Sequence, residues 1–309
     1  MKNSKFYNNI DLRNIFFCEI GIGISTNAFI LLSHFLSFFL QHKPKPIDLT
    51  IALLTLTHLL MLITMSFIAR DTFGSQDFWD DVICKSIFYI YRVLRGLSMC
   101  TTCLLSVQQA IILSHSSSCL AKFKRIPSHH SLGSLLLLWA CYCTISIHLV
   151  FTIIATPNLT SSSLLYVTES CSFLPLSYSF SQLFPTLVTF RDVSLIGLMA
   201  LSSGYMVTLL CRHKRQSQHL HDTSLSLRAS PELRATRVIL LFLWSFVVLF
   251  SLDCTVSSFR FMRNSDPNIY CIQILVANGY AIISPFVFLI TKKQIILCWK
   301  SLWQRTVNV

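Results

Sequence analysis

Long runs of apolar residues dominate the chain, and short polar segments separate them. A helix needs about 20 apolar residues to cross a bilayer, and each run is at least about that long. The pattern therefore predicts seven membrane-spanning helices. Their approximate limits are residues 16–40, 49–69, 83–113, 132–154, 187–211, 238–258 and 268–291.

The composition agrees with a membrane protein. Hydrophobic residues make up 53% of the 309 residues and charged residues 12%, against roughly 45–50% and about 25% in soluble domains. The mean hydropathy is +0.61. A soluble fold needs more surface charge, a disordered chain is less apolar, and β-barrel strands are short alternating segments. The expected fold class is thus an all-α membrane protein, one seven-helix domain over residues 1–309 with a short tail at 292–309.

The basic residues are divided unevenly between the two sets of loops. The net charge is +12; the loops that share a side with the C-terminus carry 15 Lys and Arg residues, and the loops on the other side carry six. Because cytoplasmic loops are enriched in Lys and Arg, we expect the C-terminus in the cytoplasm and the N-terminus outside. The basic residues lie in separate loops, so the charge indicates contact with a lipid bilayer and no nucleic-acid partner.

Two further features fall on the side assigned to the outside. Asn158 begins the only Asn-X-Ser/Thr sequon of the chain, which makes it a candidate N-glycosylation site. Cys84, at the start of the third run, and Cys171, in the long loop after the fourth run, can pair in the oxidising exterior. Cys271 is a competing partner for either of them.

Several charged residues lie inside the predicted spans, in the halves assigned to the outside. They are Glu19, Lys85, Arg92, Arg95, Asp192 and Asp253. At 1.5 Å per residue, Arg92 lies about 12 Å deeper than Cys84 and Arg95 about 16 Å deeper. Charged side chains at such depth face the bundle or a cavity. A set of structural ion pairs and a polar ligand site are both compatible with this pattern, and both can hold at once.

Formal counting leaves one of these cations without an acid. With Arg191 the span cations number four and the acids three, and an unpaired buried charge is costly. We therefore predict that Arg92 binds an anionic ligand group, since it is reachable from outside, and that Arg95 pairs with Asp253. Tyr89 and its aromatic neighbours suit the hydrophobic body of such a ligand.

The sequence contains no motif for a metal site, a cofactor or an enzyme active site. His34, His58 and His148 lie in spans without a second ligand at helical spacing, so packed neutral histidines are a better interpretation than a metal site. Phosphate-binding loops and hydrolase motifs do not occur. We expect no enzyme activity, no metal and no cofactor. Pro285 predicts a kink in the seventh helix, either fixed or mobile.

Several segments together resemble the vomeronasal type-1 receptor family. The third span lacks the Asp/Glu-Arg-Tyr triplet of most rhodopsin-like receptors, and the seventh has Ser284-Pro285-Phe286 instead of Asn-Pro-x-x-Tyr. Asn158 and Cys171 fall where the family has a glycosylation site and a cysteine. The similar segments are residues 45–49, 95–107, 191–207, 216–221 and 230–236.

The resemblance implies a rhodopsin-like plan, an outer N-terminus and a bridge between Cys84 and Cys171. It also implies a chemosensory receptor in the plasma membrane of vomeronasal neurons, with a small-molecule pheromone ligand and a Gi/o-type heterotrimeric G protein as partners. A sulfated steroid is an example of the anionic amphipathic ligand expected here. The candidate G-protein contacts are Gln108, Arg212, Lys214 and Arg215.

Two other classes remain open at this stage. A small channel or transporter would have polar residues through the full depth of several spans, but the inner halves hold almost no charge. A taste-type seven-helix receptor is a nearer alternative, and the pair of Cys84 and Cys171 counts against it.

Overall fold

The structure is a computed structural model, and it describes most of the chain. The described residues are 10–40, 46–73, 79–114, 128–155, 165–166, 168, 170–173, 178–220, 240, 243–256 and 267–291. Their helices are α1 (Ile10–Leu40), α2 (Pro46–Thr72), α3 (Asp81–Leu113), α4 (Ser128–Ser146), α5 (His148–Thr152), α6 (Tyr178–Leu220) and α8 (Pro267–Thr291). A further apolar helix, Leu243–Val256, lies between α6 and α8 in the chain.

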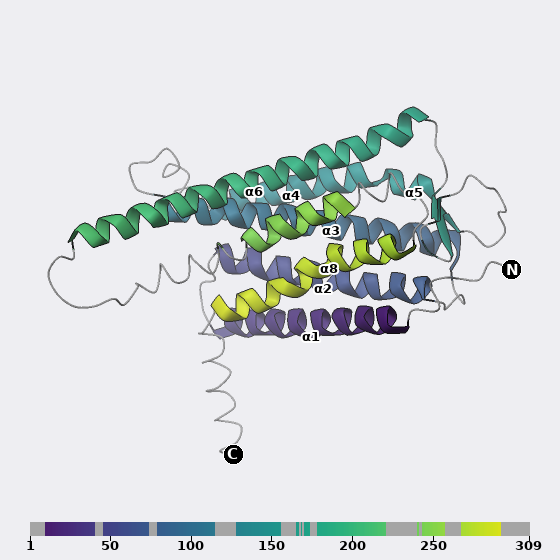
Figure 1. Cartoon of the computed structure of the whole chain (residues 1–309), viewed down its shortest axis with the longest axis horizontal. Helices are drawn as coiled ribbons and strands as arrows, with labels where there is room; N and C mark the ends of the chain where they lie inside the picture. The colour runs from purple at the N-terminus through teal and green to yellow at the C-terminus, as the bar shows by residue number, and fades with distance from the viewer. Residues whose placement is uncertain are drawn as a thin grey trace, which may run out of the picture.

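These helices run side by side as one bundle (Figure 1). The long helix α3 packs against α2, α4 and α6, and α1 packs against α2 and α8. The short α5 continues α4 after a break at Ile147, so the described helices form seven segments of the bundle. Five of the helices are long and apolar enough to cross a membrane, namely α1, α2, α4 with α5, α6 and α8. The predicted all-α, seven-helix membrane fold is confirmed.

The outer surface of the bundle is apolar. Leu32 on α1, Leu137 on α4 and Leu201 on α6 are all exposed, Leu201 to 74% of its surface. Contiguous apolar surface of this kind marks contact with another apolar phase. These side chains therefore face the lipid tails.

Two glycines let neighbouring helices approach closely. A Cβ atom at Gly96 would overlap the ring of Tyr142 on α4, and a Cβ at Gly23 would lie 2.7 Å from Leu62 and 2.9 Å from Ile282. Small residues allow such close backbone contact in membranes, where the hydrophobic effect does not drive helices together. Gly96 thereby fixes where the ring of Tyr142 lies against α3.

A small antiparallel sheet covers one end of the bundle, which we call the sheet end. It contains β1 (Ile153–Ala155), β2 (Leu165–Tyr166) and β3 (Cys171–Phe173) in the order β1-β3-β2. A disulfide joins Cys171 to Cys84 near the start of α3, with the two Cα atoms 5.9 Å apart. The structure thus selects the expected pair over Cys271.

The helix α6 is longer than the span expected at 187–211. It runs without interruption from Tyr178 to Leu220 and extends past the other helices at the end opposite the sheet (Figure 1). The interpretation of residues 212–220 as a loop is therefore wrong. No Gly or Pro occurs between Gly204 and Leu220 to end the helix. Polar residues with good helix propensity allow a helix to continue beyond the bilayer.

The apolar run at 132–154 does not stay helical to its end. The helix ends at Thr152, and Ile153–Ala155 form β1, because β-branched residues suit a strand and β3 supplies a partner. Conversely, Arg70 and Asp71, expected in a loop, belong to the last turn of α2. Asn158, the basic loops at 43–45 and 122–125 and the tail at 292–309 lie outside the described residues.

Candidate ligand-binding site

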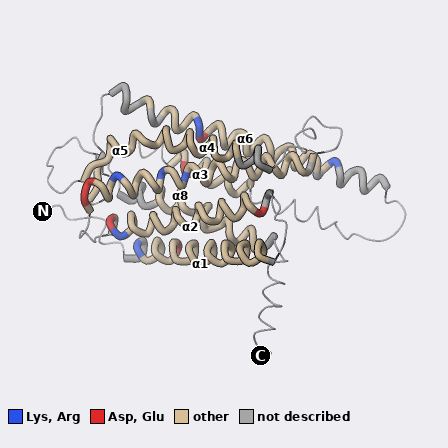
Figure 2. Tube along the Cα trace, turned by 180° about the vertical axis from the view of Figure 1, so that it is seen from behind, with Lys and Arg blue, Asp and Glu red and all other residues tan. Residues whose placement is uncertain are grey.

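Charged residues gather in the half of the bundle next to the sheet. Figure 2 shows this along the described part of the trace, where the opposite half carries few charged residues. Three helices contribute buried or partly buried members: α3 with Arg92 and Arg95, α6 with Arg191 and Asp192, and Leu243–Val256 with Asp253. We call these five residues the charged cluster.

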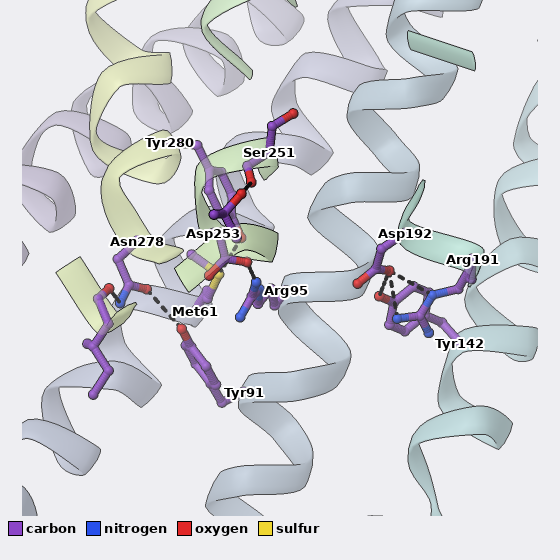
Figure 3. A network of polar contacts seen from close by, with 12 residues as sticks. Met61, Tyr91, Arg95, Tyr142, Arg191, Asp192, Ser251, Asp253, Asn278 and Tyr280 are labelled. Atoms are coloured by element: carbon purple, nitrogen blue, oxygen red, sulfur yellow. Dashed lines mark hydrogen bonds and ion pairs between the residues drawn. The ribbon is translucent and has the colours of Figure 1, made fainter. Parts of the chain in front are cut away.

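The first ion pair of the charged cluster joins α3 to the helix Leu243–Val256. Arg95 Nη2 contacts Asp253 Oδ2, and the two side chains are 15% and 3% exposed (Figure 3). The predicted pairing of Arg95 with Asp253 is confirmed. The other oxygen, Asp253 Oδ1, is buried and has no hydrogen-bond partner among the described residues.

Aromatic residues surround this ion pair. The rings of Phe250 and Tyr280 lie 4.6 Å apart between their centroids. The hydroxyl of Tyr280 lies 3.1 Å from the sulfur of Met61 on α2, and Tyr91 donates to Asn278 Oδ1 on α8 at 3.4 Å. The ion pair is therefore embedded among side chains from α2, α3, α8 and the helix Leu243–Val256.

The second ion pair lies on the α6 side of the charged cluster. Arg191 donates to Asp192 Oδ1 from Nε at 3.0 Å and from Nη2 at 2.8 Å. Its guanidinium carbon lies 3.5 Å from the centroid of the Tyr142 ring, and the Tyr142 hydroxyl donates to the same oxygen of Asp192 at 3.3 Å. Sequence reasoning missed Tyr142, whose only signal is a tyrosine within an apolar run.

Arg92 has no acidic partner among the described residues. It precedes Arg95 by one turn of α3, and it interacts electrostatically with Arg95, Asp192 and Arg191. The charged cluster thus holds three arginines and two aspartates. The formal excess is one positive charge, located at Arg92.

The sequence also predicted one cation without an acidic partner, but the ion pairs in the structure differ from those assumed in that count. Lys85 does not use a span acid: its Nζ lies 2.6 Å from Asp81 Oδ2, one turn away. Glu19 on α1 has no ion pair among the described residues. The structure therefore brings together Arg92, Arg95, Asp192 and Asp253, but places Lys85 at the start of α3 and Glu19 apart from the charged cluster.

Two carboxylates hold the sheet onto the bundle. Asp81 Oδ1 accepts a hydrogen bond from the backbone N–H of Ala155 at 2.7 Å. The ammonium of Lys85 and this N–H both lower the pKa of the Asp81 carboxyl from its ordinary value. The buried Asp71 accepts from the hydroxyl of Ser170 at 2.5 Å and from its N–H at 3.3 Å. Sequence reasoning did not assign a role to Asp71 or Asp81.

The remaining candidates lie elsewhere. Tyr89 donates to the carbonyl oxygen of Cys143 on α4 at 3.3 Å, close to the sheet end. At the opposite end Gln108 accepts from Thr50 on α2 at 3.3 Å, and Arg212 is exposed on α6. The backbone of Lys214 and Arg215 continues α6, and their side chains lie outside the described residues.

The histidine at the centre of the bundle is held by serines. His58 is fully buried, with Nε2 2.6 Å from Ser98 Oγ on α3 and Nδ1 2.9 Å from Ser284 Oγ on α8. Both ring nitrogens are thereby engaged, as expected for a packed histidine. Ser284 precedes Pro285, the proline inside α8.

Comparison with known proteins assigns the family. The sequence model of the vomeronasal organ pheromone receptor family matches residues 10–301. Vomeronasal type-1 receptor 90 of Rattus norvegicus is 53% identical over 305 residues, which is 99% of this chain and 98% of that receptor. Vomeronasal type-1 receptor 105 of Rattus norvegicus is 51% identical over 100% of this chain and 99% of its own length. Vomeronasal type-1 receptor 51 of Mus musculus is 53% identical over 97% of this chain and 94% of its own length. The chain belongs to the vomeronasal type-1 receptor family of seven-helix, G-protein-coupled pheromone receptors of the plasma membrane.

Proposed function

We propose that this receptor detects a small amphipathic molecule with an anionic head group, and that Arg92 binds the head group. One observation carries this proposal: Arg95 and Arg191 each contact an aspartate, whereas Arg92 has no acidic partner among the described residues. A cation left unpaired within an apolar bundle is costly. A bound anion removes that cost.

The surroundings of Arg92 suit the rest of such a ligand. A guanidinium binds sulfate or carboxylate oxygens through two parallel hydrogen bonds. Phe88, Tyr89 and Tyr91 lie within one turn of Arg92 on α3 and are all partly exposed. Aromatic side chains near a positive group favour an amphipathic molecule.

We further propose that the sheet end is extracellular and that the C-terminus is cytoplasmic. The uneven distribution of Lys and Arg supports this orientation. The disulfide between Cys84 and Cys171 lies at the sheet end, where an oxidising exterior allows it. The helix α1 begins at the sheet end and α8 ends at the opposite end (Figure 1), as this orientation requires.

The G-protein contact then belongs to the end opposite the sheet, and we assign it to a Gi/o-type protein. The extension of α6 carries Arg212, Lys214 and Arg215 beyond the other helices. Gln108 lies on α3 in the same half of the bundle. A basic helix at this position also attracts anionic lipid head groups, so the assignment to a G protein requires a signalling test.

The orientation is tested at Asn158. Treatment of the surface receptor with an N-glycosidase should increase its electrophoretic mobility, and Asn158→Gln should abolish this shift. Because the sequon is unique in the chain, a shift that persists in Asn158→Gln contradicts the site. Antibody access to an N-terminal tag on intact cells tests the orientation independently of glycan occupancy.

The ligand class and the coupling are tested in cells that express the full chain. The probes are a panel of steroid sulfates and their unsulfated parents. Sulfates should activate the wild type, Arg92→Gln should reduce their potency at least tenfold, and pertussis toxin should abolish the signal. The matched control is Arg13→Gln, a basic residue of α1, which should respond like the wild type. An Arg92→Gln receptor that reaches the surface with unchanged sensitivity to the sulfates contradicts the proposal.

A further inference from the structure

We propose that Asn27 is a positioning residue for α8, and that its side-chain amide acts as a releasable latch at Pro285. The latch takes the place of the backbone donor that the proline lacks. It holds α8 in one shape while it is closed, and α8 changes shape at this turn when it opens. This inference is independent of the proposed ligand, because it concerns only how α8 is attached to α1 and α2.

Pro285 interrupts the backbone hydrogen bonds of α8. A proline inside a helix has no N–H to donate to the carbonyl of the residue four positions earlier. In α8 that residue is Ala281, which is fully buried. A buried carbonyl without a donor is costly in an apolar phase, so a donor from another helix stabilises α8 at this turn.

Asn27 on α1 supplies such a donor. Its Nδ2 donates to the carbonyl oxygen of Ala281 at 2.9 Å, between residues 254 positions apart in the sequence. Asn27 is only 1% exposed, so bulk water does not compete for the bond. The bond falls on the carbonyl that Pro285 deprives of its regular donor, and this coincidence carries the inference.

The close approach of α1 to this turn of α8 depends on Gly23, one turn before Asn27. A Cβ atom at Gly23 would lie 2.9 Å from Cγ1 of Ile282, the residue after Ala281. A Cβ atom at Gly21, on the same helix, would meet nothing within 4 Å. Gly23 therefore allows the short distance that Asn27 needs in order to reach α8.

The latch opens without leaving the amide nitrogen of Asn27 unpaired. The same Nδ2 also donates to the carbonyl oxygen of Gly23, within α1, at 2.8 Å. Opening therefore breaks one of its two bonds and keeps the other. Because single hydrogen bonds between helices in membranes are weak, the closed and open arrangements are able to exchange.

The neighbouring residue of α8 is attached to α2 and α3. Ser284 Oγ lies 2.9 Å from His58 Nδ1, and His58 Nε2 lies 2.6 Å from Ser98 Oγ. These contacts hold Ser284 while Asn27 holds the carbonyl of Ala281. The latch therefore acts on the single turn between Ala281 and Pro285.

The test measures hydrogen exchange by mass spectrometry on the purified full chain in a nonionic detergent, without ligand. Residues 278–289 of α8 report on the latch, and peptides of α4 are the internal reference. Asn27→Leu keeps a side chain of similar size but removes the donor to the buried carbonyl, so exchange in residues 278–289 should accelerate at least about fivefold. The control is Ser25→Ala, which removes a bond within α1 only and should leave this exchange unchanged.

Two further comparisons separate the latch from general support of the fold. Pro285→Ala restores a backbone N–H that is able to bond to the carbonyl of Ala281. In that background Asn27→Leu should change the exchange less than about twofold, because the two substitutions act on the same carbonyl. Gly23→Ala should accelerate exchange in residues 278–289 by pushing α1 away from α8, whereas Gly21→Ala should not.

Three results would overturn this inference. The first is unchanged exchange of residues 278–289 in Asn27→Leu, and the second is an equal acceleration with and without Pro285→Ala. The third is an acceleration of α4 peptides as large as that of α8, which would show that Asn27 supports only the stability of the whole fold. Should Asn27→Leu or Pro285→Ala not fold, equal α8 exchange in Gly23→Ala and Gly21→Ala contradicts the latch. The proposed function is tested separately, because these measurements contain no ligand and no G protein.

Discussion

The two halves of the helix bundle are held together by different chemistry. The half next to the sheet contains a disulfide, the Arg95–Asp253 pair with its buried aspartate, the partly buried Arg191–Asp192 pair and carboxylates that hold the sheet. In the opposite half, two described contacts between helices are made by neutral side chains. Ser106 on α3 contacts Ser202 on α6, and Thr50 on α2 donates to Gln108 on α3 at 3.3 Å.

The two kinds of contact differ in what the loss of one partner costs. Hydrogen bonds between neutral side chains in membranes average about 0.6 kcal/mol. Removing one partner of a buried ion pair costs about 3–5 kcal/mol, because the other charge is left buried and uncompensated. A ligand site needs fixed donors, and a region that changes shape on activation needs weak contacts with alternatives. The charged half is thus suited to recognition, and the neutral half is suited to rearrangement.

The largest expected effect comes from the disulfide. The bond between Cys84 and Cys171 closes a loop of 87 residues, which corresponds to about 4–5 kcal/mol in the chain-entropy treatment. Cys84→Ala, Cys171→Ala and the double variant should therefore lose surface delivery to the same degree, because all three remove one bond. Surface labelling of intact cells measures this, and mass spectrometry that finds both thiols free in mature wild type would contradict the bond.

The Arg95–Asp253 pair comes next. Arg95→Gln leaves Asp253, which is 3% exposed, as a buried charge without its partner, at a cost of about 3–5 kcal/mol. We expect a strong loss of surface receptor from Arg95→Gln and from Asp253→Asn. The double variant, which removes both charges, should recover part of it. Additive losses in the double variant would show that the two residues do not act as a pair.

A contact of the neutral half should matter much less. Ser106→Ala removes the bond to Ser202, but Ser202 still donates to the carbonyl of Met199 at 3.0 Å. The loss should be at most about 1 kcal/mol, seen as a small decrease in the Tm of the purified receptor. A decrease as large as that of Arg95→Gln would remove the distinction between the two halves.

The sequence predicted the general architecture because it depends on composition and on the length of apolar runs. Seven runs, a sided charge distribution and two cysteines at matching ends lead to the bundle and its disulfide. The pair of Arg95 and Asp253 was also predictable, because two opposite charges at similar depth in an apolar phase must meet. Family membership now excludes the channel, transporter and taste-receptor alternatives.

The predictions that were wrong or incomplete mostly concern contacts between residues far apart in the sequence. Ile153–Ala155 form a strand because β3 pairs with them. The sequence around these residues does not predict that pairing. Arg191 turns to the adjacent Asp192 because Tyr142, 49 residues earlier in the sequence, lies beneath its guanidinium. Lys85 forms an ion pair with Asp81. The count of charges within the predicted spans did not include Asp81, because the sequence placed it in a loop.

The smallest expected effect concerns Asp81, at the exposed start of α3 before the expected span. Its folded-state pKa is lowered by Lys85 and by the N–H of Ala155 from the ordinary value of 3.8. The stability that this carboxylate contributes is therefore fully present above the unfolded-state pKa and is lost as the pH falls through the lowered pKa. Because Asp81 is about half exposed, solvent screens its pairing with Lys85.

Asp81→Asn should therefore leave surface delivery and the Tm near neutral pH almost unchanged. Between about pH 5 and pH 3 the wild type should lose slightly more stability than the variant, because only the wild type carries the titrating group. Thermal unfolding of the two purified receptors across this pH range measures the difference. Identical pH profiles would mean that Asp81 does not hold β1, and that the disulfide and Asp71 keep the sheet on the bundle.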